Sequence, residues 1–352
     1  EHADSPMPGT THGRSAQPVT LGHHLLAHAW PLLRDLERFD GWAGRAAVSP
    51  LGAGALATST LGLDPAATAD ELGFARPFEN SIDAVADRDV VLEFLATASI
   101  CSVHLSRLAA DLVRWTDPGL GWAELADEDA TGSSMMPQKR NPDPAELARA
   151  KTARISAGFA GLCAVLQGLP LGYHRDLQED KEPVFDAADT LELVLAALVG
   201  MVQRAHFDVA TMRRAAADPG LFATDVAEGL VRVDVPFREA HRRTGDLLRR
   251  LEGEGRSLAH LTATEWESFG LPEGAVLLNP DRAIAARSIP GGPSAASVRD
   301  QVAAIERAVS ARPSKRPHGR RPATSRDGDD VGSSGAEPRA PGLADRPTTT
   351  QG

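Results

Sequence analysis

Three long segments with apolar residues at helical spacing constrain the fold of this chain more than any other feature. They span residues 89–115, 145–169 and about 185–216. The first segment shows the pattern most clearly, with apolar positions that include Leu95, Ala98, Leu105 and Leu112. Helices of this length exceed the average for globular proteins and pack side by side in an elongated bundle. The pattern therefore predicts an all-α protein built on long central helices.

Composition supports helices over sheets, because alanine and leucine outnumber Val, Ile and Tyr, and only 5% of the 352 residues are aromatic. The net charge of −11, with no clustered basic face, argues against a nucleic-acid partner. No run of about 18 apolar residues occurs, so no membrane span is expected. Cys101 and Cys163 lack CxxC partners and lie in apolar helical patterns, which favours core packing in a reducing cytoplasm.

The chain divides into three parts by pattern and composition. We predict a central helical-bundle domain over 1–217, a smaller C-terminal helical domain over 218–311 and a disordered tail over 312–352, which almost lacks large apolar residues. Residues 1–18 are expected to form a loop, and Pro31 is expected to kink the helix that follows. Shorter helices are expected at about 66–72, 223–233, 236–253, 263–269 and 294–311.

The segment TGSSMMPQKRNPD, residues 131–143 and here called the serine loop, fits neither a helix nor a core. A serine hydroxyl becomes a base or nucleophile when nearby groups stabilise its ionised form, as backbone amides in a Gly-Ser-Ser turn can. Lys139 and Arg140 add positive charge, and Asn141 can hydrogen-bond a carboxylate. The set suits proton abstraction beside a carboxylate, where negative charge develops. The alternative is an ordinary Gly-rich loop with solvated cations.

Two further segments combine polar groups in the same way. Thr10-Thr11-His12 lies close to the start of the chain, and the charged run at 173–182, YHRDLQEDKE, lies between two apolar helical patterns. Each has a simpler interpretation. His12 could be a surface or structural histidine, and the charged run could be a solvated helix face held by local ion pairs.

A group of three histidines, His23, His24 and His28, raises the question of a metal site, because His24 and His28 are four residues apart on a predicted helix. Zinc sites of this type carry an HExxH pattern or a paired carboxylate, and the local sequence has neither. We therefore expect no metal at these residues.

Three motifs resemble those of known lyases. GSSMMPQKRNPDPAE resembles the pattern GSSxMPxKxNPxxxE of the fumarase/aspartase lyase superfamily. MPGTTHGRSAQPV and YHRDLQEDKEPVFD resemble MPGYTHxQxAQPV and YNxDLQEDKExxFD, which are typical of the argininosuccinate lyase family. NSIDAVADRD, ATDVAEGLVRVDVPFREAH and GGPSAASV follow in the same family-like order. The resemblance covers roughly residues 2–310.

This resemblance implies a fumarase/aspartase-like fold in which four protomers share a bundle of central helices and three subunits build each active site. It implies reversible cleavage of argininosuccinate to arginine and fumarate in arginine biosynthesis, without metal or organic cofactor. The residues at the family's catalytic positions are Ser133 and His12. The residues at its substrate-binding positions are Thr11, Lys139, Asn141, Tyr173, Gln178 and Lys181.

In the implied mechanism, one group removes a proton from the succinyl carbon and another protonates the departing guanidino nitrogen. Lys139, Asn141 and the loop amides would stabilise the doubly charged intermediate more than the ground state. Ser133 is favoured as the base, acting from a mobile loop, with His12 across the substrate. The opposite assignment of Ser133 and His12 stays open.

The sequence departs from the family at its start. Family members carry a preceding domain with an HTGRSRND segment that binds substrate, and this chain has none. Thr10 also replaces the family's tyrosine beside the Thr-His pair. The sequence is thus expected to be a fragment, a chain whose start was misassigned or a decayed gene product. Two alternative functions follow, a superfamily lyase for another substituted succinate and a non-catalytic oligomerising homologue.

Overall fold

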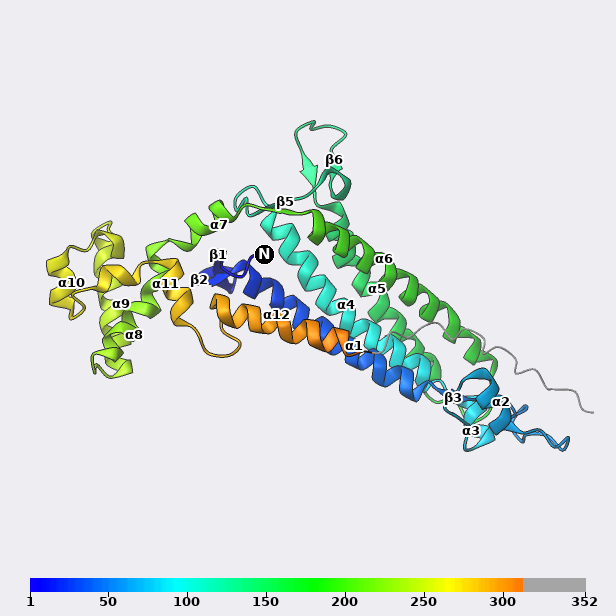
Figure 1. Ribbon diagram of the computed structural model, residues 1–352. Coiled ribbons are helices and arrows are strands. Elements are labelled where there is room, and N and C mark those ends of the chain that lie inside the picture. The colour runs from blue at the N-terminus through cyan, green and yellow to red at the C-terminus, as the bar shows by residue number, and fades with distance from the viewer. Residues whose placement is uncertain (313–352) are drawn as a thin grey trace, which may run out of the picture. The chain divides into compact units, whose positions relative to one another are not determined.

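The computed structural model describes residues 1–312. Apart from Arg312, the tail predicted at 312–352 lies outside the described residues. Within residues 1–312 the protein is mostly helical, with four short two-stranded sheets (Figure 1). The predicted fold class, a helical protein with long helices, is confirmed.

Four long helices build the main core, and one of them contacts the other three (Figure 1). The helices are α1 (Leu21–Arg45), α4 (Asp89–Trp115), α5 (Asp143–Leu166) and α6 (Lys181–Arg204). The central helix is α4, which has the predicted bounds, whereas α5 was predicted at 145–169. The core sits between these helices, as their apolar stripes predict.

By length and hydropathy alone, α4 could span a membrane. In the structure its apolar stripe packs against α1, α5 and α6, and Leu95, Leu105 and Leu112 are almost inaccessible to solvent. Burying one leucine side chain is worth about 1.5–3 kcal/mol, so this stripe is a major source of stability. The packing of α4 is that of a core helix.

The first helix, α1, continues through Pro31 and ends at Arg45. Its Asp35 carboxylate is 2% exposed and accepts hydrogen bonds from Arg38 Nη1 at 2.9 Å and from His104 Nδ1 of α4 at 2.7 Å. A buried carboxylate is costly unless it is paired in this way. The network therefore fixes the pairing of α1 with α4.

The helix predicted at about 185–216 is two helices, so that prediction was wrong. After α6 ends, strand β8 (His206–Phe207) pairs antiparallel with β5 (Ala123–Glu124), and α7 (Val209–Ala216) follows. The Asp208 side chain accepts a hydrogen bond from the backbone N–H of Thr211 at 2.8 Å and so begins the new helix. The break depends on pairing with a strand more than 80 residues earlier, which helical periodicity does not register.

The start of the chain is a β-hairpin, so the predicted loop over 1–18 was also wrong. Strand β1 (Pro6–Thr11) pairs antiparallel with β2 (Arg14–Thr20). Thr20 then caps α1 by accepting a hydrogen bond from the backbone N–H of His23 at 3.1 Å. The hairpin therefore leads directly into the first core helix.

Between α1 and α4 lie two short helices, each opened by a side-chain cap. Asp64 caps α2 (Pro65–Leu72), close to the predicted helix, and Asn80 caps α3 (Ser81–Ala86), which the sequence analysis did not predict. Two short strands, β3 (Val48–Ser49) and β4 (Arg76–Pro77), pair in parallel beside α2.

After residue 218 the chain forms a series of helices, and residues 226–271 within this segment form a second hydrophobic cluster that includes Leu230, Leu251 and Trp266. Four of its helices lie close to the predicted positions, and α11 was not predicted. The elements are η3 (Pro219–Phe222), α8 (Ala223–Arg232), α9 (Phe237–Gly253), η4 (Leu258–His260), α10 (Ala263–Phe269), η5 (Gly274–Leu277), α11 (Pro280–Ala286) and α12 (Ala295–Ser310).

The last helix, α12, packs along α1 (Figure 1). Trp30 Nε1 of α1 donates a hydrogen bond to Gln301 Oε1 of α12 at 3.2 Å. The first long helix and the last helix among residues 1–312 are therefore in direct contact. A division into domains at residues 217 and 218 stays a prediction.

Candidate active site

The first group of predicted site residues lies at the tip of the β1–β2 hairpin. Thr11 ends β1, and His12 and Gly13 form the turn with positive φ angles of 53° and 72°. Two successive positive φ angles are typical of the tight turns that suit the twist of a hairpin. Glycine adopts this conformation freely and histidine does so at some cost. The turn thus presents His12 as an exposed side chain at a fixed place.

Arg114, near the end of α4, holds this tip in position. Its Nη2 donates to the carbonyl oxygen of Gly13 at 3.1 Å, and its Nη1 donates to Thr10 Oγ1 at 3.4 Å. Thr10 is the residue that replaces the family's tyrosine, and its hydroxyl accepts this hydrogen bond from Arg114. Sequence reasoning missed Arg114, because it lies about 100 residues from the turn and outside the motifs.

The second group lies on the serine loop, which connects strands β6 (Thr131–Gly132) and β7 (Arg140–Asn141) before α5 (Figure 1). Ser133 Oγ accepts hydrogen bonds from the backbone N–H groups of Met135 at 3.2 Å and Met136 at 3.1 Å. Two donors aimed at one hydroxyl oxygen stabilise negative charge on it. The arrangement matches the amide-rich turn that the Gly-Ser-Ser sequence predicts.

The two adjacent cations of the serine loop have different surroundings. Arg140 pairs with Glu124 at 2.8 Å and with Asp127 at 2.6 Å, and it donates to the carbonyl oxygen of Leu125 at 2.8 Å. Arg140 is therefore engaged in anchoring the base of the loop. The side chain of Lys139 is exposed and has no ion pair among residues 1–312, so it is available to a substrate anion.

The third group lies between α5 and α6, on the 3₁₀ helix η2 (Arg175–Asp180) and its flanks. Gln178 Nε2 donates a hydrogen bond to the Tyr173 hydroxyl at 3.1 Å, and Lys181 Nζ contacts Asp180 Oδ1 at 2.7 Å. Leu177 is buried and fixes η2 against the helices. The structure thus brings Tyr173, Gln178 and Lys181 together on one short segment.

Asp180 links this group to α4. Its carboxylate is 6% exposed and also accepts a hydrogen bond from Arg88 Nε at 2.6 Å. Arg88 in turn donates to the carbonyl oxygens of Val85 and Asp87, next to the end of α3. Asp180 therefore holds Lys181 against a fixed point of the fold. The sequence offered a signal, since Arg88 and Asp180 both lie in family-like motifs, but their pairing is not visible along the chain.

Acidic side chains surround the start of α4 beside this third group. Burial, followed by the charges of Asp87, Glu93 and Asp83, raises the pKa of Asp89. A cleft of about 250 Å³ lies next to it, lined by residues of α3, α4, the loop after α5 and η2, among them His174 and Leu177. The third group therefore borders an acidic hollow.

The helix lengths place the third group at the opposite end of the bundle from the first group and the serine loop. The serine loop precedes α5 and the third group follows it, and a helix of 24 residues is roughly 36 Å long. Arg88 and Arg114 likewise mark the two ends of α4, whose 27 residues extend about 40 Å. Among residues 1–312, no hydrogen bond or ion pair joins one group to another. One chain does not assemble the eight predicted residues into a single site.

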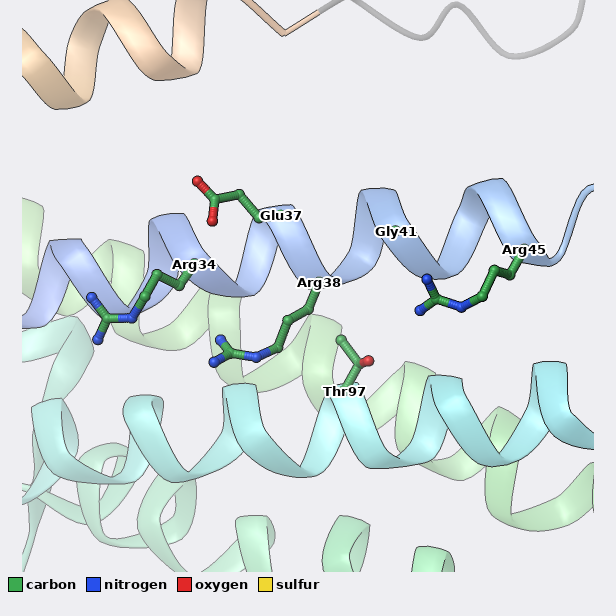
Figure 2. A pocket seen from close by; sticks show the side chains of 6 residues that line it. All are labelled: Arg34, Glu37, Arg38, Gly41, Arg45 and Thr97. Carbon is green, nitrogen blue, oxygen red and sulfur yellow. The ribbon is translucent and has the colours of Figure 1, made fainter.

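A separate hollow of about 380 Å³ lies along the C-terminal half of α1 (Figure 2). Figure 2 shows Arg34 and Arg38 reaching toward α4, where Thr97 lies, and Glu37 pointing away from it. Arg38 is paired with Asp35, and Arg45 is paired with Glu93 at 2.8 Å. None of the predicted site residues lines this hollow, so it is distinct from the three groups.

Comparisons with known proteins agree with the motifs. Residues 1–157 match the family described as "Lyase", and residues 220–286 match the family described as "Argininosuccinate lyase C-terminal". The argininosuccinate lyase of Kineococcus radiotolerans is 49% identical over 319 residues, which cover 88% of this chain and 66% of that protein. The argininosuccinate lyase of Clavibacter sepedonicus is 50% identical over 306 residues, covering 86% of this chain and 62% of that protein. The chain thus spans just under two thirds of the length of these relatives.

Solved structures show the same fold. EDDS lyase in complex with formate has a TM-score of 0.82 and 28% identity, covering 88% of this chain and 64% of that chain. The class II fumarase of Schistosoma mansoni has a TM-score of 0.66 at 15% identity, covering 80% of this chain and 62% of that chain. The second likeness concerns the fold alone.

Proposed function

Because this chain belongs to the argininosuccinate lyase family, we propose that it catalyses the reversible cleavage of argininosuccinate to arginine and fumarate by acid–base elimination. The observation that carries the proposal is the 49% identity over 88% of the chain to a lyase of that name. The three residue groups add chemical support, since each presents polar side chains that could bind the carboxylates or the guanidino group of this substrate.

Ser133 is the proposed base, which removes the proton from the succinyl carbon beside the carboxylate. The two amide donors from Met135 and Met136 support this role, because they stabilise the ionised hydroxyl. Lys139 and Asn141, on the same loop, hold the carboxylate as it gains charge. The loop is exposed in the single chain and would close over the substrate, so closure is expected to contribute to the rate.

His12 is the proposed partner of Ser133 and protonates the departing guanidino nitrogen, with Thr11 contacting the substrate beside it. The rigid hairpin tip supports this role, because a catalytic acid needs a fixed position. The opposite assignment, His12 as base and Ser133 as acid, uses the same two groups. No metal or organic cofactor takes part in the proposed reaction.

We further propose that the protein works as a homotetramer whose active sites are shared between subunits. The argument is geometric, since groups separated by roughly 36 Å along one helix can meet only if they come from different chains. In such a site, Tyr173, Gln178 and Lys181 of one subunit face the serine loop of another. Gln178 and Lys181 would then contact the substrate that Ser133 deprotonates.

An exposed apolar face supports this assembly. Phe185, Leu193 and Val199 of α6 are 65%, 56% and 53% exposed. A groove of about 510 Å³ runs beside them, lined almost entirely by apolar side chains of α6 together with Phe94 of α4. Apolar surface of this kind is typical of interfaces between subunits.

We also propose that the protein works in the cytoplasm. Its two cysteines are free, as is usual for proteins in a reducing compartment.

The proposal is tested by following fumarate release from argininosuccinate, both with this chain and with a chimera that carries the N-terminal third of the Kineococcus radiotolerans relative ahead of Glu1. Fumarate release by the chimera with a kcat of about 1–10³ s⁻¹, the usual range for enzymes, supports the proposed reaction. A folded, tetrameric chimera that is inactive on argininosuccinate but releases fumarate from another N-substituted succinate would favour a lyase of different specificity. Inactivity on both would favour a non-catalytic homologue.

A further inference from the structure

Three potential metal ligands from two helices converge at one point outside the proposed active site. His24 and His28 lie one turn apart on α1, and Asp111 lies on α4. The Nε2 atoms of the two histidines are 2.6 and 2.8 Å from the same oxygen, Asp111 Oδ2. One ligand atom from each of the three residues lies within 4.8 Å of the others.

The carboxylate ligand comes from a distant part of the chain, since none accompanies the two histidines in the local sequence. Asp111 is 83 residues from His28 in sequence, and only the packing of α1 on α4 brings it to the two histidines. The spacing of four residues places both imidazoles on one face of α1, and that face meets α4. Two imidazoles and one carboxylate form a donor set that suits divalent transition metals.

The three side chains of the cluster are largely shielded from solvent by the residues around them. The side chains of His24, His28 and Asp111 are 23%, 15% and 25% exposed. The Trp115 ring packs edge-on against the His24 ring, with centroids 5.0 Å apart. Among residues 1–312, the two histidines are the only ion-pair partners of Asp111, so no lysine or arginine neutralises its charge.

We propose that His24, His28 and Asp111 bind one divalent transition-metal ion, with Zn²⁺ as the best match. Zinc bonds of about 2.0–2.2 Å in tetrahedral geometry place ligand atoms roughly 3.3 Å apart, so small rotations of these side chains admit the ion. Because the cluster is partly exposed, water completes the fourth position. The ion would link α1 to α4 at Asp111, three residues before Arg114, which holds the His12 hairpin. The ion takes no part in the proposed reaction.

The test uses the full chain after treatment with a chelator that is then removed. Co²⁺ is titrated in as a spectroscopic probe, and Zn²⁺ binding is measured by competition and by calorimetry. We expect one ion per chain, a visible absorption spectrum typical of tetrahedral Co²⁺, and a higher unfolding midpoint with metal. His24→Gln and Asp111→Asn are each expected to weaken binding at least tenfold.

The matched control is His241→Gln, since His241 is exposed on α9 and should leave binding unchanged. His24→Gln keeps the hydrogen bond between His28 and Asp111, so it tests binding even if Asp111→Asn fails to fold. The absence of stoichiometric Co²⁺ and Zn²⁺ binding by the wild-type chain would overturn the proposal. Equal affinity in wild type and in folded His24→Gln would overturn it too. Both readouts are independent of lyase activity.

Discussion

Arg88 and Asp180 form an ion pair with 2.6 Å between Arg88 Nε and Asp180 Oδ2, and the two side chains are only 18% and 7% exposed. The pair joins the residue before α4 to the residue before α6. Because Asp180 also contacts Lys181, a structural ion pair and a proposed substrate-binding residue share one carboxylate.

Removing one partner of this pair should destabilise the fold strongly. Arg88→Gln leaves a buried carboxylate with less compensation, which typically costs about 3–5 kcal/mol. Denaturant unfolding should show this loss, whereas Arg154→Gln, at the more exposed pair with Asp186, should cost less than about 1 kcal/mol. Similar losses in the two variants would contradict the importance assigned to the buried pair.

Ser133→Ala should lower kcat by about 10²–10⁴-fold, the usual contribution of a general acid or base. Fumarate release by the active chimera measures the effect, and sedimentation velocity checks that the oligomer is preserved. Ser134→Ala is the control, because the amides of Met135 and Met136 point at Ser133 Oγ, and its loss should be much smaller. Full activity of Ser133→Ala would refute the proposed base.

Gly13→Ala should destabilise the hairpin by about 1–2 kcal/mol, because the Cβ of an alanine clashes with its own backbone at the positive φ of 72° found at this position. Nothing lies within 4 Å of the added Cβ, so the cost comes from the backbone alone. Gly132→Ala is a matched control with an equally open Cβ position and no positive φ. Faster amide hydrogen exchange in β1 and β2 for Gly13→Ala, but not for Gly132→Ala, is the expected result.

Cys101 should resist alkylation in the native protein. Burial, followed by the charge and hydrogen bonding of Asp35, raises the pKa of its thiol to about 12. Iodoacetamide at pH 8 should therefore label Cys163, which is less buried, well before Cys101. Mass spectrometry of tryptic peptides measures the order, and labelling of Cys101 should become rapid only in denaturant. Equal native rates would contradict the burial described.

Glu265 should make stability depend on pH in the acid range. Hydrogen bonds from Arg256, then from the backbone and side chain of Thr262, lower the pKa of its carboxyl from 4.5 to about 2. A carboxyl with a lowered folded-state pKa stabilises the protein above its unfolded pKa, and this contribution is lost as pH falls. Glu265→Gln should therefore be less stable than wild type at pH 6, with the difference vanishing between about pH 4.5 and 2. Glu267→Gln, on the exposed side of the same helix, should show no such pH-dependent difference.

The sequence predicted best what depends on local pattern. The bounds of α4 followed from its apolar stripe, and α8, α9 and α10 lie within a few residues of their predicted positions. What it missed depends on contacts between distant segments. Strand β8 interrupts a helical pattern because it pairs with β5. The β1–β2 hairpin forms in a segment whose apolar and polar residues alternate too little to predict strands.

The same division holds for the candidate site. Ser133, His12 and Lys181 could be named from motifs, because the motifs are continuous in sequence. Arg114 could not, since it contacts the His12 hairpin from about 100 positions away. The eight predicted site residues stay predictions as a functional set, because one chain keeps them in three groups.

The contact between Trp30 and Gln301 also bears on how the chain folds during synthesis. The two residues are 271 positions apart, and ribosomes add about 5–20 residues per second. The side of α1 that α12 covers thus emerges roughly 15–50 s before its partner exists. During that interval Trp30 and the rest of this side of α1 lack the helix that covers them in the folded chain, so α1 completes its packing only after α12 has been synthesised.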